Sequence, residues 1–284
     1  MKAGQEFGFF QLINHGIPND LMNDVLKVAG EFFRLPAEDK ASFYSEDPKK
    51  ACRLYTSIDY DKEKVHYWRD NLRQSCHPLD RYIEDWPANP TRYRKVMGKY
   101  ALKVREVSLL ILDLICEGLG LELGYFEAGG LSNVQLMGLN YYPICPDPSL
   151  TLGLPKHSDV NVITLLNQGL VLGLQVLKDE EWLSVEPIPN AFLVNIGHTL
   201  QIISNGKLRS VDHRVVTNKH IARATIANFV HPSGDSQIAP ATALIDKCNL
   251  PLYRQFTYNE FVRTYVTDTH QGTPPLKRYE QSKP

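Results

Sequence analysis

The sequence has few of the features that would place this chain outside the ordinary globular proteins. Its five cysteines form no CxxC pair and are odd in number, so free thiols in a reducing compartment are expected over a disulfide framework. The longest apolar run, residues 107–115, is interrupted by Asp113 and is far shorter than the roughly 20 residues that cross a bilayer. We therefore expect a cytoplasmic protein with no membrane span.

The sequence also lacks an excess of either charge. Its 31 basic and 32 acidic residues leave a formal net charge of −1, and no segment concentrates lysine and arginine into the basic field that nucleic-acid binding requires. With 43% hydrophobic and 22% charged residues the composition is that of a packed globular domain. The expected partner is a small molecule, and the expected oligomeric state is a monomer.

The first half of the chain is predicted to be mostly helical. Residues 6–14 are rich in aromatic and branched side chains and predict one strand, which begins so early that a shortened N-terminus is suggested. Apolar residues at helical spacing predict helices at 18–33 and 93–119, the second started by Asn89-Pro90 and ended by Gly118 and Gly120. Residues 37–88 are polar and weakly periodic, which indicates loops and short elements.

Beyond Asn133 the sequence consists of short runs of strand-forming residues separated by proline, glycine and asparagine. The predicted strands are 134–142, 160–166, 174–177, 182–185, 192–196, 213–217 and 224–230. Closely spaced strands of this kind predict an all-β barrel or a double-sheet jelly roll, with a closing helix at 256–266. We expect one catalytic domain over 1–284, with a mostly helical front half at 1–133, a β core at 134–235 and a C-terminal extension at 236–284.

The segment LPKHSDVNVITLL carries a metal-ligand pattern. His157 and Asp159 lie two apart, and in an extended strand such residues point to the same face. A second imidazole would complete the two-His-one-carboxylate set of non-haem Fe(II) oxygenases and leave open positions on the ion. His213 is the best candidate, because several strands and turns can lie between it and His157. An isolated HxD is more often a surface or hydrogen-bonded pair, so the surrounding sequence must show whether this one binds a metal.

A possible anion-binding pair follows in the strand-like segment ARATIANFV. Arg223 and Thr225 share a face there, so a guanidinium and a hydroxyl can converge on one carboxylate. The alternative is an internal arginine paired with a protein Asp or Glu. Asn140 and Tyr142 share a face at the end of another predicted strand, where the tyrosine could donate to the same ligand or simply pack in the core.

Together these motifs resemble the plant 2-oxoglutarate/Fe(II)-dependent dioxygenases of specialised metabolism and hormone turnover. The resemblance covers essentially the whole chain, through EFGFFQLINHGIP, YWRDNLRQSCHPL, GLNYYPICPDPSLTLGLPKHSD and NIGHTLQIISNGKLRSVDHRVV. It implies an α+β protein whose mainly β core is a double-stranded β-helix, a distorted jelly roll, with flanking helices. It also implies Fe(II), 2-oxoglutarate as cosubstrate and ascorbate in support. The site residues implied are His157, Asp159 and His213 for iron, and Arg223, Thr225, Tyr142 and Asn140 for 2-oxoglutarate.

Three departures from the family pattern stand out. Thr225 replaces the usual serine but keeps the hydroxyl, so the carboxylate clamp is expected to survive. His198 stands where relatives commonly carry an aspartate, and a hydrogen-bonded structural histidine is expected over a ligand. Relatives also have some tens of residues before the EFGFFQ strand.

The resemblance implies an oxidoreductase that uses molecular oxygen to hydroxylate or desaturate a small plant metabolite, with a slight preference for a phenolic such as a flavonoid or a salicylate-type acid. An alkaloid or other specialised metabolite is the alternative substrate. A hydrolytic or isomerising metal site would leave Arg223 and Thr225 unexplained, and the intact motifs speak against a non-catalytic binder on a degenerate scaffold. Residues proposed for the pocket, each also a possible core residue, are Phe229, His231, Phe256 and Phe261.

Overall fold

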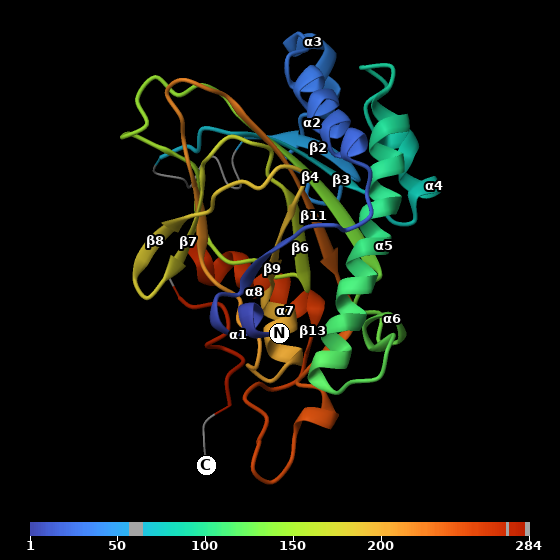
Figure 1. The fold of residues 1–284 in the computed structure, drawn as a ribbon, viewed down its shortest axis with the longest axis vertical. Helices are drawn as coiled ribbons and strands as arrows, with labels where there is room; N and C mark the ends of the chain where they lie inside the picture. Colours follow the sequence, from blue (N-terminus) through green and yellow to red (C-terminus); the bar gives the residue numbers. More distant parts are fainter. Residues whose placement is uncertain (57–64, 271–272, 282–284) are drawn as a thin grey trace.

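A computed structural model describes residues 1–56, 65–270 and 273–281 of the chain (Figure 1). The strands are β1 (Phe9–Leu12), β2 (Cys52–Tyr55), β3 (Asp70–Ser75), β4 (Val134–Tyr142), β5 (Leu152–His157), β6 (Ile163–Asn167), β7 (Leu174–Lys178), β8 (Glu181–Ser184), β9 (Phe192–Ile196), β10 (His213–Val216), β11 (Arg223–His231), β12 (Gln237–Ile238) and β13 (Phe256–Thr257). The helices are α1 (Lys2–Glu6), α2 (Asn19–Phe33), α3 (Ala37–Lys40), α4 (Leu79–Tyr82), α5 (Tyr93–Leu119), α6 (Tyr125–Ala128), α7 (His198–Ile203) and α8 (Tyr258–His270). Short 3₁₀ helices lie at Ala41–Phe43, Ile83–Asp85 and Thr242–Leu244.

Two antiparallel sheets form the core of the molecule. The large sheet has the order β1-β9-β6-β11-β4-β3-β2, and the small sheet has the order β5-β10-β7-β8. Between them packs a cluster of buried side chains that come from both sheets: Phe9, Tyr142 and Leu193 from the large sheet, and Leu174, Val176 and Val215 from the small one. This sheet-on-sheet arrangement with flanking helices confirms the predicted jelly-roll core.

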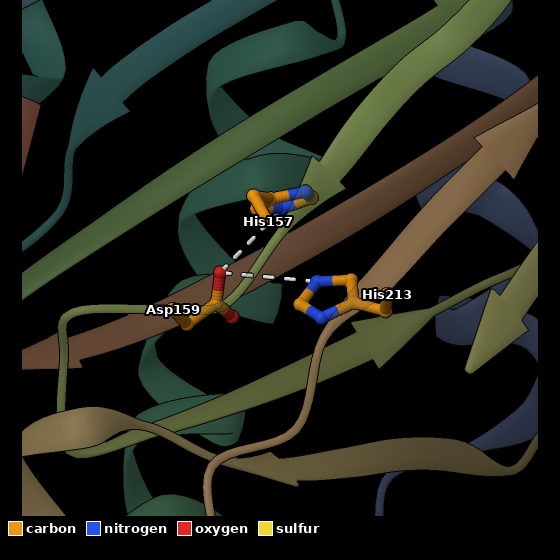
Figure 2. A group of neighbouring side chains, drawn as sticks. All are labelled: His157, Asp159 and His213. Carbon is orange, nitrogen blue, oxygen red and sulfur yellow. Dashed lines mark ion pairs between the residues drawn. The ribbon is translucent and has the colours of Figure 1, made fainter. Parts of the chain in front are cut away.

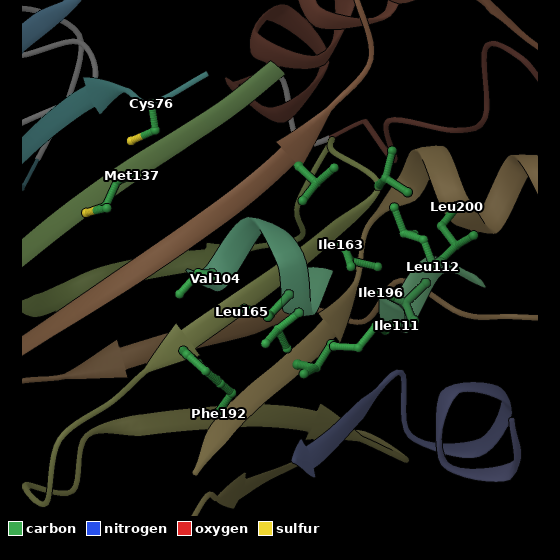
Figure 3. Packing of buried hydrophobic residues seen from close by; sticks show 14 of the residues in the cluster. Cys76, Val104, Ile111, Leu112, Met137, Ile163, Leu165, Phe192, Ile196 and Leu200 are labelled. Carbon is green, nitrogen blue, oxygen red and sulfur yellow. The ribbon is translucent and has the colours of Figure 1, made fainter. Parts of the chain in front are cut away.

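The other face of the large sheet is covered by helices α2 and α5 (Figure 1). Leu165 of β6 and Phe192 of β9 are fully buried there with Val104 of α5, and Figure 3 shows this packing. Side chains alternate between the two faces along each strand. Every second residue therefore enters this helix-covered core, and the residues between them face the small sheet. The large sheet therefore divides an apolar outer core from the inner face that carries the candidate site.

Buried hydrogen bonds fix helix α5 along this sheet. The Tyr93 hydroxyl donates to Gln74 Oε1 at 2.7 Å, and Asn228 Nδ2 donates to the Tyr100 hydroxyl at 3.2 Å. Both helical tyrosines are completely buried, so each hydroxyl needs such a partner. At its end the helix turns through Gly120 at φ +74°, where the Leu121 N–H donates to the Cys116 carbonyl at 2.8 Å.

The long periodic elements agree with the sequence-based expectations, and the short ones do not. Helix α5 and strands β4 and β9 have the predicted bounds, although Gly118 lies inside α5 and Asn89-Pro90 lies before its start. The strand predicted at 6–14 is wrong at both ends, because α1 takes its first residue and β1 contains only four residues. The closing helix begins after β13 and runs to His270, beyond the predicted 256–266.

The polar segment 37–88 contains two strands of the large sheet that the loop interpretation missed. Strand β3 pairs with β4 along its whole length, and β2 pairs with β3 at the edge. Residues 57–64 of this segment lie outside the described residues, as do 271–272 and 282–284 of the predicted C-terminal extension. Within the described ranges, no helix combines the length and the apolar character needed to cross a membrane.

Truncating a side chain at the interface between α5 and the large sheet should destabilise the fold. Leu165 is completely buried in this core, so Leu165→Ala should lower the free energy of unfolding by about 2–5 kcal/mol, through lost apolar burial and the cavity left behind. Urea denaturation followed by circular dichroism measures this change.

Leu110 on the solvent face of α5 is the matched control, since 59% of it is exposed. Leu110→Ala should change the free energy of unfolding by no more than about 0.5 kcal/mol. Equal losses in the two variants would contradict the placement of α5 on the sheet.

Candidate metal centre

His157, Asp159 and His213 converge between the ends of two neighbouring strands (Figure 2). His157 is the last residue of β5 and His213 is the first residue of β10, and the two are direct partners in the antiparallel pairing. Their ring centroids lie 4.2 Å apart. Asp159 Oδ1 lies 3.8 Å from His157 Nε2 and 3.9 Å from His213 Nε2. One ligand atom from each residue therefore lies within 4.8 Å of the others, as binding of a single ion requires.

The structure brings the three predicted residues together, but not in the way the sequence argument expected. Strand β5 ends at His157, and Asp159 lies in the loop that follows, so the two side chains do not meet through strand alternation. Pairing of β5 with β10 brings the imidazoles together, and the loop then turns the carboxylate towards them. Across the described ranges of the chain, no other group of three such side chains has this geometry.

Hydrogen bonds aim each ligand atom at the centre of the cluster. His157 Nδ1 donates to the Pro155 carbonyl at 2.8 Å, and His213 Nδ1 donates to the Val211 carbonyl at 3.2 Å. A carbonyl only accepts, so in the neutral ring Nε2 keeps its lone pair, which is the state that binds a metal. The two imidazoles therefore present Nε2 to the side of the cluster where Asp159 Oδ1 lies.

The Asp159 carboxylate is held through its other oxygen. Oδ2 accepts hydrogen bonds from Thr164 Oγ1 at 2.6 Å and from Asn195 Nδ2 at 2.8 Å. Burial acts against ionisation of this group, yet the charges of His213 and His157 and these two hydrogen bonds together hold its pKa below the ordinary value. Burial, and then the charge of His213, lower the pKa of His157 to about 4. The centre therefore offers a neutral His157 ring and an ionised carboxylate at neutral pH.

Thr164 and Asn195 were not predicted as site residues. They lie on neighbouring strands β6 and β9, where they are direct cross-strand partners on the inner face. A single polar residue within an apolar strand, as in FLVNI, is the signal in the sequence that could have identified them.

The second predicted constellation also comes together on the inner face. Strands β11 and β4 pair Arg223 with Tyr142 and Thr225 with Asn140. The Arg223 Cζ atom lies 5.3 Å from the centre of the Tyr142 ring, and Asn140 Nδ2 donates to Thr225 Oγ1 at 3.4 Å. The four side chains are each at most 8% exposed. Asn140 Oδ1 is already bonded to β3, because it accepts from Asn71 Nδ2 at 2.7 Å.

Arg223 lacks a carboxylate partner among the described residues. Its Nε donates to the Val171 carbonyl at 3.0 Å, while its Nη2 is buried with no hydrogen-bond partner. Burial lowers the pKa of this guanidinium, but an arginine stays protonated in proteins. An unpaired buried cation is costly, so this arrangement fits an anionic ligand and disfavours the alternative of an ordinary internal ion pair.

Two glycines, one in β5 and one just before β7, let the backbone of the small sheet approach Tyr142 and Arg223 closely. A Cβ atom on Gly153 of β5 would lie 2.6 Å from Tyr142 Cδ1, and one on Gly173 would lie 3.1 Å from Arg223 Cδ. Real Cβ atoms do not tolerate the first of these distances. Gly153 therefore lets the strand that ends in His157 pack directly on Tyr142, which brings the metal cluster and the arginine to the same space between the sheets.

His198 lies behind the metal loop and outside the ligand group. Its backbone N–H donates to the Asp159 carbonyl at 2.7 Å, and its ring Nε2 is 2.7 Å from Ser158 Oγ. The ring is therefore hydrogen-bonded through Nε2, as expected of a structural histidine, while its Nδ1 is buried with no partner among the described residues. Of the residues suggested for a pocket, Phe256 and Phe261 are buried members of the main hydrophobic cluster, which favours the alternative of core residues for them.

Two family models match the chain. The model of the 2OG-Fe(II) oxygenase superfamily matches residues 133–232, and the model described as the non-haem dioxygenase in morphine synthesis N-terminal matches residues 1–89. The family models therefore cover the residues around the metal cluster and the first 89 residues of the chain.

Known proteins resemble the chain over nearly its whole length. Flavanone 3-dioxygenase 2 of Oryza sativa subsp. japonica is 47% identical over 93% of this chain and 77% of its own, and hyoscyamine 6-dioxygenase of Hyoscyamus niger is 44% identical over 98% and 84%. A crystal structure of JOX2 in complex with 2OG, Fe and JA has a TM-score of 0.91 at 33% identity, covering 99% of this chain and 84% of its own.

Acid should destabilise the metal-free protein through its buried histidines. Burial lowers the pKa of His198 from 6.5 to about 4, so between these values the unfolded chain binds more protons than the folded one. The folded protein therefore has its full stability above the pKa of the unfolded histidine, and its free energy of unfolding decreases as the pH falls below that value. At pH 5 a histidine with this pKa shift lowers the free energy of unfolding by about 2 kcal/mol relative to neutral pH.

The free energy of unfolding by urea, measured at pH 7.5 and pH 5 in the presence of a chelator, tests this effect. His198→Gln should reduce the loss between the two pH values by about 2 kcal/mol, since glutamine does not titrate. If the variant loses as much stability as the parent chain, His198 is not a buried neutral histidine.

Proposed function

Because the chain belongs to the 2OG-Fe(II) oxygenase superfamily, we propose that it hydroxylates or desaturates a small plant metabolite at the centre formed by His157, Asp159 and His213. The chain is a 2-oxoglutarate-dependent dioxygenase, and its cofactors are Fe(II) and 2-oxoglutarate. In the proposed assignment the two Nε2 atoms and Asp159 Oδ1 bind the iron. Their aim at one point supports this, as does the fit of two imidazoles and one carboxylate to non-haem Fe(II).

Arg223 carries the assignment of the cosubstrate site. Its buried and unpartnered Nη2 needs an acceptor, and the distal carboxylate of 2-oxoglutarate supplies one between the sheets. We assign the Thr225 hydroxyl to the same carboxylate, and Tyr142 and Asn140 to further contacts with the cosubstrate, because cross-strand pairing sets them beside Arg223. Fe(II) with Asp159 carries one net positive charge and Arg223 carries another, so a dianion balances the site.

When bound, Fe(II) and 2-oxoglutarate supply the activation of oxygen, in which 2-oxoglutarate is oxidatively decarboxylated to succinate and a substrate C–H bond is oxidised. The chain itself positions the reactants. Thr164 and Asn195 keep Asp159 ionised and oriented, and Arg223 fixes the far end of the cosubstrate. The buried side chains between the sheets, such as Leu193 and Val215, keep bulk water out.

We favour a phenolic substrate, such as a flavonoid or a salicylate-type acid. The 47% identity to a flavanone 3-dioxygenase supports this choice. An alkaloid is the second candidate, supported by the 44% identity to a hyoscyamine 6-dioxygenase. We also propose that residues 1–284 act as one catalytic unit, because a single hydrophobic cluster contains side chains from Ile17 to Tyr279.

Substitution of Asp159 and of Arg223 should separate metal binding from cosubstrate binding. Asp159→Ala removes the only anionic ligand and should abolish iron retention, measured by metal analysis, together with the visible charge-transfer band that anaerobic Fe(II) and 2-oxoglutarate give in such sites. Arg223→Gln should retain iron but weaken 2-oxoglutarate binding about 10- to 100-fold, the value of a charge-assisted contact.

The exposed Arg81 is the matched control, and Arg81→Gln should leave both properties unchanged. Absence of the charge-transfer band in the parent chain would overturn the proposed site. A reversed pattern, in which Arg223→Gln loses iron and Asp159→Ala keeps it, would show that the roles are wrongly assigned.

A screen of phenolic and alkaloid compounds by product mass should identify the substrate class. With a phenolic substrate we expect a product heavier by one oxygen atom, or lighter by two hydrogen atoms, formed together with an equal amount of succinate. Turnover of alkaloids alone would exclude the phenolic assignment. Asp159→Ala serves as the inactive control, since it lacks a metal ligand.

A further inference from the structure

Strands β2 and β3 place an unusual pair of arginines on the inner face of the large sheet. Arg53 and Arg73 are direct cross-strand partners. Arg73 lies two residues beyond Asn71, whose side chain bonds Asn140 of the proposed cosubstrate site, so alternation sets both on the same face. Like charges directly opposite one another in a sheet are destabilising. The fold therefore maintains two adjacent cations on the face that carries the proposed iron centre.

No carboxylate among the described residues neutralises this pair. The groups that act electrostatically on Arg73 are Tyr55, Arg53 and Tyr258, and burial lowers the pKa of Arg73. Among the described residues, Arg53 Nη1 makes only long contacts, to the Ser45 carbonyl at 3.5 Å and the Glu46 carbonyl at 3.4 Å. Its Nε is buried with no hydrogen-bond partner. The ion pairs of the described ranges involve other arginines and lysines.

Polar groups of β11 and α8 face the same region. His231 lies on the inner face of β11, where its Nδ1 is 2.6 Å from the Tyr258 hydroxyl and its Nε2 is buried without a partner. Burial, and then the charge of Arg73, lower the pKa of His231 to about 3. The charges of both Asp159 and Arg73 act on Tyr258. Arg73 and Asp159 are therefore both close enough to this histidine and tyrosine for their charges to act on them.

The aromatic ring of Phe229, which is half-buried, lies near the arginine pair. Phe229 is half-buried on the inner face of β11, and its ring lies over Gly138, the β4 partner of Arg73, where a Cβ atom would be 3.3 Å from Phe229 Cε2. Gly138 adds no side chain to this face, so an aromatic group of a ligand can lie against Phe229 with its polar end at Arg73.

We propose that Arg73 and Arg53 bind a carboxylate of the substrate, and that the oxygenase therefore acts on an organic acid. This inference rests on the proposed function and names the class of its substrate. A guanidinium fork matches a carboxylate with two parallel hydrogen bonds, and one anion would relieve the repulsion of the arginine pair. A cationic alkaloid would be repelled. Two residues of strand span roughly 7 Å, so a small aromatic acid held at Arg73 extends towards the level of Asn71 and Asn140.

Matched acids and amides test the proposal. The full chain, loaded anaerobically with Fe(II) and 2-oxoglutarate, is titrated by calorimetry with salicylate and salicylamide, and with 3-phenylpropionate and its primary amide. At least one acid should bind about tenfold or more tightly than its amide. Arg73→Gln should weaken binding of that acid about 10- to 100-fold and change amide binding less than about threefold, since the amide carries no charge.

Two further variants keep the test decisive if Arg73→Gln does not fold. Arg73→Lys keeps the charge but not the fork, so it should retain part of the preference for the acid. Arg81→Gln removes an exposed arginine and should retain all of it. Equal binding of every acid and its amide by the parent chain, or an equal loss of both in Arg73→Gln, would overturn the proposal.

Failure of the proposed function gives a different result. If Fe(II) and 2-oxoglutarate produce no charge-transfer band, the iron and cosubstrate assignment fails, while the calorimetric comparison of acid and amide still decides whether the arginine pair binds a carboxylate. If the band forms and no acid is preferred, only the substrate class is wrong.

Discussion

The buried carboxylate of Asp159 is the constraint on which the arrangement of the site depends. An ionised group in a protein interior is tolerated only when hydrogen bonds and opposite charges compensate for lost hydration. Thr164 of β6 and Asn195 of β9 supply the hydrogen bonds from the large sheet, and the two imidazoles come from the neighbouring strands β5 and β10 of the small sheet. One carboxylate thus joins groups from both sheets. A metal ion bound there would act as a cross-link between them, which couples metal binding to the stability of the whole core.

The arginines of the inner face are positive charges that also need compensation for lost hydration. Arg223, Arg53 and Arg73 lie on the inner face, and no carboxylate among the described residues pairs with them. The outer face of the same strands is apolar and packs under α2 and α5. One sheet therefore separates a face that packs against helices from a face whose arginines we propose are balanced by bound ligands.

This division explains which parts of the structure the sequence could predict. Helix α5 and strands β4 and β9 were identified with their bounds because a regular apolar period runs through them. Strand β3, with the sequence DNLRQS, was missed because Asn71 and Arg73 occupy its inner face in place of strand-forming residues. The candidate metal ligands were predicted from residue types, from their spacing and from the family resemblance. The position of Asp159 in a loop depends on the pairing of β5 with β10, which no local pattern encodes.

Two donors already occupy Asp159 Oδ2, so this carboxylate has only one oxygen left to give. A metal held through it would therefore be bound in a monodentate way, which would suit a small ion that also accepts nitrogen and would be poor for Ca²⁺, with its need for six to eight oxygen ligands. Nothing in three such ligands rejects Co²⁺, Ni²⁺ or Zn²⁺, which bind N/O sites more tightly than Fe²⁺. Such a ligand set would not by itself select Fe(II) over these competing ions. Contact with a nickel resin during purification would load the chain with an inert competitor.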